Sequence, residues 1–325
     1  MESEELRKPK IVDSEELRKS KKRKKVREVS NKTIYYILLS VFGLTMIFPF
    51  LWMVSTSLKE PGDVFTYPPE WIPDPVVFQN YPEAWNAVPF GRAYVNSSVI
   101  AIVVTLGQVF TSSLAAYAFA RLQFPGRDKL FLAYLATMMI PGAVTMIPVF
   151  ILLKVMPEIL DKVFNTEFWS TARYMGPYFV GKPIGIDSYF ALIVPGFFSA
   201  YGTFMLRQFF MGIPRDLEDA ARIDGCSKMG TYFRIILPLS KPALATLTIF
   251  TFMGSWRAFM WPLIVTSRIE LQTLPIMLAS FQGLYKTDWT LLMAASIIVM
   301  VPMLIVFIFG QRFFISGIRL GAIKG

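Results

Sequence analysis

Long apolar segments alternate with polar ones along most of this chain. Six stretches are apolar enough to cross a bilayer as helices, which takes about 20 residues each. None of the six contains an acidic residue, and Arg257 is their single basic residue. The pattern predicts an all-α integral membrane protein with six transmembrane helices, at Ile34–Leu58, Tyr94–Ala120, Leu130–Leu153, Ser188–Leu206, Pro242–Thr266 and Trp289–Gln311.

Lysine and arginine are unevenly distributed among the polar segments. Both terminal tails and the two loops on the same side hold 24 of them, whereas the three loops on the other side hold 8. Cytoplasmic segments carry the excess of basic residues in membrane proteins. We therefore predict a multi-pass protein of the plasma or inner cell membrane, with both termini and the loop around Asp219 in the cytoplasm.

Residues 1–32 form a basic tail that we expect to be disordered. Its run Lys21-Lys22-Arg23-Lys24-Lys25 is interpreted as a topology anchor, with binding of anionic membrane lipid as the alternative. Residues 33–325 are predicted to form a single six-helix domain. This domain carries an outer insertion at about 155–187 and an inner polar loop at about 212–238.

Composition supports the membrane assignment and excludes several functions. The chain is 54% apolar and 17% charged, against about 25% charged in soluble domains. The net charge of +10 is mostly an orientation signal, because the basic residues do not form one face with interleaved aromatics, as nucleic-acid binding requires. A single Cys226 and the absence of histidine argue against a metal site, a catalytic triad or an enzyme. No G-x-x-x-x-G-K-[ST] phosphate loop is present, so a partner must bind any ATP.

The inner polar loop is predicted to fold as a helix–turn–helix. Pro214 suits the first turn of a helix, acidic residues follow it where the helix dipole favours them, and Gly225 can end the helix in the left-handed conformation. A second helix is expected from about Lys228, before Pro238 and Pro242 break the chain. Two side-chain rows recur at helical spacing, a small one at Leu217, Ala220, Ala221 and Asp224 and a bulky one at Met229, Tyr232, Phe233 and Ile236.

The same loop resembles the EAA loop of ABC importer permeases, which reads E-A-A-x3-G-x9-I-x-L-P. The matching residues are Asp219, Ala220, Ala221, Gly225, Ile235, Leu237 and Pro238. The resemblance implies a coupling helix that docks into a cleft on an ATPase subunit, with Glu218 and Asp224 beside the motif. Asp219 stands where the family usually has Glu, so the charge is kept with a shorter reach. The alternative is a loop packed under its own membrane helices.

Other short motifs resemble the maltose-type carbohydrate permeases of this family. They include Phe48–Lys59, Ala116–Arg121, Met139–Pro141, Leu206–Phe210, Ser280–Gly283 and the terminal Gly317–Gly325. The resemblance implies the type I ABC importer permease fold for most of residues 34–325. It also implies that ATP and magnesium are bound by a partner and that this chain itself holds no cofactor.

Two further groups of residues are candidates for contact with the solute or its carrier. Arg257 follows Trp256 inside the fifth segment, where a charge costs roughly 2.5–3.5 kcal/mol. Arg257 is interpreted as facing the pathway or a paired permease, with snorkelling to the outer interface as the alternative. Trp256 is a further candidate for contact with the pathway. The resemblance implies that the loop before the last helix enters the cleft of the binding protein, and the alternative is a loop packed on the membrane surface. That loop is Thr273–Lys286, and its candidate contact residues are Ser280, Phe281, Gln282 and Gly283.

The resemblance implies the membrane subunit of an ATP-driven sugar importer, most simply of oligosaccharides. Its expected partners are a second permease, two ATPase subunits and an extracytoplasmic solute-binding protein, and its expected mechanism is alternating access. The same architecture for another solute, such as a glycerol phosphate, is one alternative. A channel or ion-coupled transporter acting alone is another, and it predicts intramembrane acids, which the six segments lack.

Overall fold

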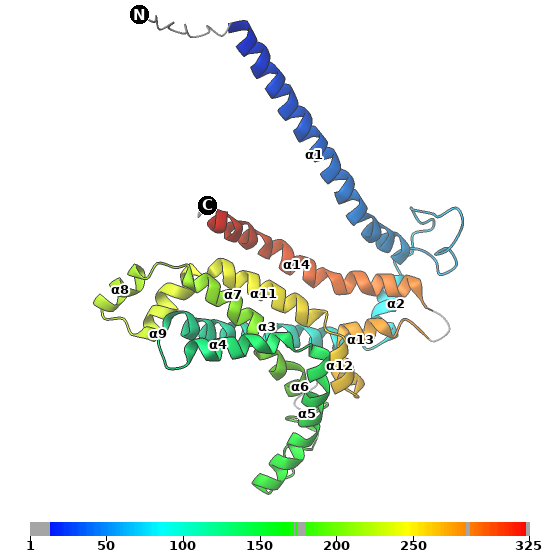
Figure 1. Ribbon diagram of the computed structural model, residues 1–325. Coiled ribbons are helices and arrows are strands. Elements are labelled where there is room, and N and C mark those ends of the chain that lie inside the picture. Colours follow the sequence, from blue (N-terminus) through cyan, green and yellow to red (C-terminus); the bar gives the residue numbers. More distant parts are fainter. Residues whose placement is uncertain (1–13, 172, 175–179, 284–286, 323–325) are drawn as a thin grey trace, which may run out of the picture.

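The computed structural model describes residues 14–171, 173–174, 180–283 and 287–322. Almost all regular structure is helical (Figure 1). The helices are α1 (Ser14–Ser57), α2 (Asn80–Ala87), α3 (Phe90–Arg121), α4 (Arg127–Ala136), α5 (Gly142–Phe164), α6 (Tyr189–Ile193), α7 (Ala200–Met211), α8 (Asp216–Ile223), α9 (Lys228–Thr231), α10 (Leu237–Leu239), α11 (Lys241–Trp256), α12 (Met260–Val265), α13 (Leu274–Ala279) and α14 (Trp289–Ala322). Tighter or wider turns are the 3-10 segments η1 (Thr137–Met139), η2 (Val194–Phe197) and η4 (Ile269–Leu271) and the π-helical η3 (Tyr232–Ile236).

Five helical segments of the described chain are long and apolar enough to cross a membrane. A sixth arises if the pair Lys228–Leu239 and Lys241–Trp256, bent by 78°, is counted as one span. The helical membrane class is thus as predicted. The five segments are Glu28–Ser57, Phe90–Arg121, Gly142–Phe164, Tyr189–Met211 and Trp289–Arg312.

Three predicted segments differ from the structure because the backbone breaks inside them. The third, Leu130–Leu153, is interrupted at Pro141, since a proline disfavours the α conformation of the residue before it and Ile140 is extended. Helix α5 then continues to Phe164, so the first ten residues of the predicted outer insertion, 155–164, are helical. The fourth, Ser188–Leu206, is extended at Phe198 and Ser199, between η2 and α7. The fifth segment ends at Trp256, and a helix resumes only at Met260.

The N-terminal tail and the rest of the insertion also carry structure. Helix α1 begins at Ser14, so the tail expected to be disordered is helical from there, and residues 1–13 lie outside the described chain. Asp161 accepts hydrogen bonds from the backbone N–H groups of Trp169 and Ser170 at 2.9 and 3.0 Å, which folds the chain back after α5. A two-residue antiparallel ladder follows, β1 (Arg173–Tyr174) with β2 (Val180–Gly181).

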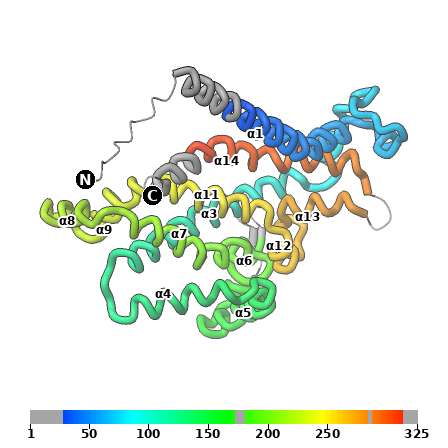
Figure 2. The backbone as a smooth tube through the Cα atoms, turned by 45° about the horizontal axis from the view of Figure 1, so that its top comes forward, coloured from blue at the N-terminus to red at the C-terminus, as the bar shows by residue number. Residues whose placement is uncertain are grey.

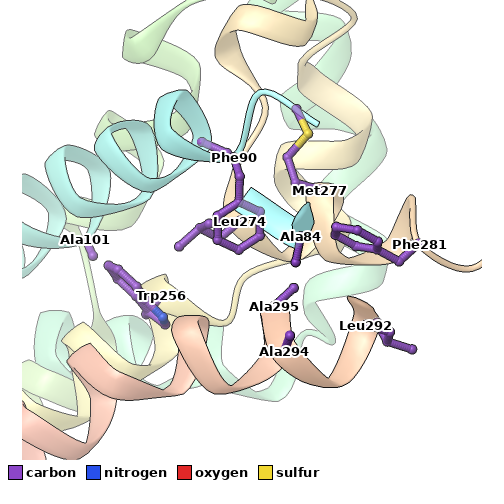
Figure 3. Close-up of a cluster of buried hydrophobic side chains, with 11 residues drawn as sticks. Ala84, Phe90, Ala101, Trp256, Leu274, Met277, Phe281, Leu292, Ala294 and Ala295 are labelled. Atoms are coloured by element: carbon purple, nitrogen blue, oxygen red, sulfur yellow. The ribbon is translucent and has the colours of Figure 1, made fainter. Parts of the chain in front are cut away.

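Helix α3 is the central element, with α7 and α11 packed against it and α14 against α11. Figure 1 shows α8 and α9 at one end of α3, and α2 and α13 at the other. A buried apolar cluster closes the α2–α13 end (Figure 3). It joins Ala84 of α2, Phe90 of α3, Trp256 of α11, Leu274 of α13 and Ala295 of α14.

Helix α1 stands apart from this bundle. Figures 1 and 2 show it outside the group formed by α3, α7 and α11, where it contacts α14. No residue of its most apolar window is buried within the chain. Its apolar surface is therefore left for lipid or for another membrane protein.

Glycine lets α3 and η2 approach closely. A Cβ placed at Gly107 would lie 2.4 Å from the ring of Phe197, which is far inside contact distance. Gly43 of α1 offers the opposite environment, because a Cβ there would meet no atom within 4 Å.

We predict that Gly107→Ala lowers the free energy of unfolding by about 1–3 kcal/mol, as overpacking does elsewhere. Gly43→Ala should be neutral or stabilising, since alanine is the better helix former. Thermal unfolding of the detergent-purified chain measures both variants. Equal unfolding temperatures would contradict the close α3–η2 contact.

Candidate functional site

The loop at 212–238 folds as the predicted helix–turn–helix. Helix α8 ends at Ile223, and Gly225 adopts the left-handed conformation with φ at +81°. The N–H of Cys226 donates to the carbonyl of Ala221 at 2.8 Å and closes the turn. Ser227 caps α9, its hydroxyl accepting from the N–H of Gly230 at 3.1 Å.

The end of the loop differs from the prediction. Pro238 does not break the chain at its own position but lies in the helical turn α10, directly after the π-helical η3. The bend of 78° falls instead at Ser240, between α10 and α11. Ile235 and Leu237 are half-buried beside the bend, and Pro238 is exposed.

Helix α8 has an inward and an outward face. Glu218 and Ala221 are buried, whereas Asp219, Ala220, Ile223 and Asp224 are exposed. Ile223 is the most exposed large apolar residue of the loop, at 87%. The predicted small-residue face is therefore divided, because Ala221 packs against the chain itself and Ala220 does not.

The second predicted row, of bulky residues, is divided in the same way. Tyr232 and Ile236 are fully buried against α3 and α7, while Met229 and Phe233 point outward. The Tyr232 hydroxyl lies 2.7 Å from that of Ser113 on α3. One face of this loop thus packs inward, as the alternative predicted, and the other face is exposed in the part of the chain that the structure describes. Docking on an ATPase stays a prediction.

Arg121, at the end of α3, binds the inward face of α8. Its Nε lies 2.9 Å from Oε1 of Glu218, and the two side chains are only 4% and 9% exposed. The same guanidinium donates to the carbonyl of Ile213 at 2.6 Å and to that of Phe210. Sequence reasoning gave Arg121 no role in the site: it was an orientation charge and the last residue of the motif Ala116–Arg121.

The outward side of this junction is strongly charged. Asp219 and Arg222 form an exposed ion pair at 3.6 Å, one helical turn apart. Beside them lies a cavity of about 420 Å³, lined among others by Arg215 and Lys228. A polar recess and an exposed isoleucine therefore share one end of the molecule.

The structure separates Trp256 from Arg257. Trp256 is buried, stacks on Phe252 at 5.6 Å and donates from its indole N–H to the carbonyl of Val299 at 3.1 Å. This corrects its assignment to the pathway, because it packs in the core shown in Figure 3. Arg257 is exposed in the break after α11, and its Nε donates to the carbonyl of Met253 at 3.1 Å.

The loop before α14 is also only partly exposed. Phe281 is 7% exposed and belongs to the buried cluster, so it is not available as a probe. Ser280, Gln282 and Gly283 are exposed, and Gln282 pairs with Thr287. Residues 284–286 lie outside the described chain.

A cavity of about 630 Å³ lies between α3, α5, α7 and α11. Its lining is mostly apolar, with a small number of polar groups, among them Gln108, Tyr201 and Ser255. Gln108 donates from its amide to the Thr251 hydroxyl at 2.9 Å. Sequence reasoning missed these residues, because isolated polar side chains in apolar helices carry no spacing signal.

This architecture is that of a multi-pass membrane protein. The chain belongs to the family of binding-protein-dependent transport system inner membrane components, whose family model matches residues 108–320. It is thus an ABC importer permease and not an enzyme, as the sequence predicted.

Relatives in three bacteria extend the likeness to nearly the whole chain. The arabinooligosaccharides transport system permease protein AraQ of Bacillus subtilis is 34% identical over 90% of this chain and 95% of its own. The sn-glycerol-3-phosphate transport system permease protein UgpE of Yersinia pestis is 32% identical over 87% and 94%. The diacetylchitobiose uptake system permease protein DasC of Streptomyces coelicolor is 29% identical over 88% and 94%.

A solved structure shares the fold. A chain of a bacterial ABC transporter involved in importing the acidic polysaccharide alginate superposes with a TM-score of 0.69 and 21% identity. The match covers 89% of this chain and 97% of that one.

We predict that Trp256→Ala lowers the free energy of unfolding by about 3–5 kcal/mol, the usual loss for a buried tryptophan. Arg257→Gln should leave it unchanged, because that side chain is exposed. The two neighbours serve as each other's control in a thermal unfolding assay in detergent. A large loss from Arg257→Gln would show that the guanidinium is structural.

Proposed function

We propose that this chain is one of two permease subunits of an ATP-driven importer of carbohydrates, most simply of oligosaccharides. The observation that carries the proposal is the exposed face of α8, which has a motif of the importer family on a surface that the described residues leave uncovered. The names of AraQ and DasC support a saccharide. UgpE supports the alternative, a glycerol phosphate.

The proposed orientation places both termini and α8 in the cytoplasm. Lys and Arg counts support it, because the side that carries α8 holds 24 and the other 8. The chain has six spans if the bent pair at Ser240 is counted as one crossing. An even number of spans is consistent with both termini on the same side of the membrane. The protein then resides in the plasma or inner cell membrane.

On the cytoplasmic side, α8 is proposed to dock into a cleft on an ATPase subunit that binds ATP and magnesium. Ile223 and Ala220 supply the apolar contact, and Asp219 and Asp224 the charges around it. Glu218 is excluded from that contact because it is paired inward with Arg121. Glu218 therefore does not replace Asp219 in the charged contact with the ATPase.

Within the membrane, the 630 Å³ cavity is proposed as this chain's half of the pathway. Hydroxyl and amide groups such as those of Tyr201, Ser255 and Gln108 suit the hydroxyls of a sugar. Arg257 follows two of the lining residues, Gly254 and Ser255, and is proposed to face the pathway or the second permease. The free surface of α1 is proposed to pack on that second permease.

On the outer side, an extracytoplasmic binding protein is proposed to deliver the solute. The exposed Ser280, Gln282 and Gly283 form one candidate contact, and the segment after α5, with its β1–β2 ladder, forms another. Closure of the ATPase pair then displaces α8, the membrane helices rock, and access to the cavity alternates. This chain binds the solute and positions α8, and its ATPase partners hydrolyse ATP.

Reconstitution of the whole assembly tests the proposal. We expect proteoliposomes with both permeases, the ATPase and the binding protein to accumulate arabinotriose or diacetylchitobiose. Accumulation should require ATP on the side of the membrane where the ATPase is bound. Accumulation of sn-glycerol-3-phosphate alone would favour the alternative solute. Uptake that persists without the ATPase would overturn the proposal in favour of a transporter acting alone. Arg257→Gln belongs in the same assay, where unchanged uptake removes its pathway role.

We predict that Ile223→Ala weakens association with the ATPase by at least about 1 kcal/mol, as truncation of an interface anchor does. Ile72→Ala is the matched control, since Ile72 is 84% exposed on the loop after α1, at the opposite end of the bundle. Titration of the ATPase onto the permease pair in nanodiscs measures both. Equal affinities would show that α8 does not carry the contact.

A further inference from the structure

We propose that Arg121 is a positioning residue that joins α8 to the ends of α3 and α7, so that displacement of α8 passes directly to α3. The inference rests on the proposed docking of an ATPase and names how its movement enters the membrane. It concerns the inward face of α8, which the docking partner does not touch.

Helix α8 needs such a connection because its backbone is poorly anchored. Among the described elements, α9 is the helix that its backbone closely approaches, and α9 is itself only four residues long. The attachment of α8 to the membrane helices therefore depends on its buried side chains, Glu218 and Ala221.

The guanidinium of Arg121 is suited to bridge three elements at once. It is planar and presents several donors in fixed directions. One side meets Glu218 of α8 at 2.9 Å, and the other donates to the carbonyls of Phe210 and Ile213, at and just after the end of α7. Because Arg121 is the last residue of α3, three helix ends converge on one charge.

Contacts around Arg121 hold the other half of the loop to α3. The Tyr117 hydroxyl, one turn earlier on α3, donates to the carbonyl of Lys228 in α9 at 2.9 Å. Ser113, a further turn back, pairs with Tyr232. Arg207 of α7 donates to the carbonyl of Phe119 at 3.3 Å. These bonds make α3 the membrane helix to which α8 and α9 are fixed.

The Arg121–Glu218 ion pair is buried, so the loss of either partner should be strongly disruptive. Removing one partner of a buried ion pair leaves an uncompensated charge, which is far more disruptive than losing an exposed pair. An exposed pair of the same 2.9 Å length, Arg127–Asp128, lies just beyond the end of α3. It provides a control with matched chemistry and different burial.

The experiment uses the assembled complex with its binding protein in proteoliposomes. Spin labels on Asp216→Cys in α8 and Leu106→Cys in α3, in a Cys226→Ser background, report the distance between the two helices. We expect it to stay narrow and constant between nucleotide-free and ATP–vanadate-trapped states. In Glu218→Gln we expect a broad distribution that shifts between these states, and Asp128→Asn should behave as the parent does.

The second readout is solute transported per ATP hydrolysed, with arabinotriose and diacetylchitobiose as probes. We expect Glu218→Gln to lower this ratio by about fivefold or more, the lower end of typical coupling factors, while the ATPase still co-purifies. Arg121→Lys keeps a cation for Glu218 but loses the fork, so an intermediate ratio is expected. If Glu218→Gln fails to fold, the transport ratio of Arg121→Lys tests the inference instead.

An unchanged ratio with an unchanged distance distribution, in either folded variant, overturns the inference. Failure of the parent complex to bind the ATPase or to transport overturns the proposed function instead. A ratio lowered equally by Asp128→Asn would also overturn the inference, because it would assign the effect to surface charge.

Discussion

The fold depends on one constraint: inside a bilayer, every backbone N–H and C=O group must find its partner within the protein. Helices satisfy this automatically, and each helix break needs another source of hydrogen bonds. At Ser240 the residue is fully buried, and both its N–H and its hydroxyl donate to the carbonyl of Ile236. At the break before α7, the Ser199 hydroxyl accepts from Gly202, and Thr111 of α3 donates to the carbonyl of Phe197.

These protected breaks set the positions of the α8–α9 loop and of Arg257. The 78° bend at Ser240 turns α9 and η3 away from α11, which brings Tyr232 against α3 and sets α8 at the end of the bundle. The break after Trp256 leaves Arg257 exposed at the edge of the face of α11 that lines the large cavity.

Sequence patterns predicted the features that depend on local composition and on the helical spacing of side chains. The apolar segments, the two short helices of the loop and the left-handed Gly225 follow from local chemistry. Tertiary contacts decided the rest. Pro141 moved the third span because it begins a new helix, and the predicted segment was long enough to hide that break. Phe281 and Trp256 are aromatic residues in a core formed by five elements, and no single segment contains that information.

The adjacent acids of α8 show the same limit at the level of one residue. Successive helical positions are rotated by about 100°, so Glu218 and Asp219 cannot serve the same neighbour. Only the position of Arg121, almost 100 residues earlier in the chain, identifies Glu218 as the inward one. Its longer side chain spans the distance to a buried guanidinium. Asp219, with the shorter side chain, lies on the exposed face, 3.6 Å from Arg222. The departure from the usual Glu thus falls on the outward position, where it leaves the attachment of α8 to its own helices intact.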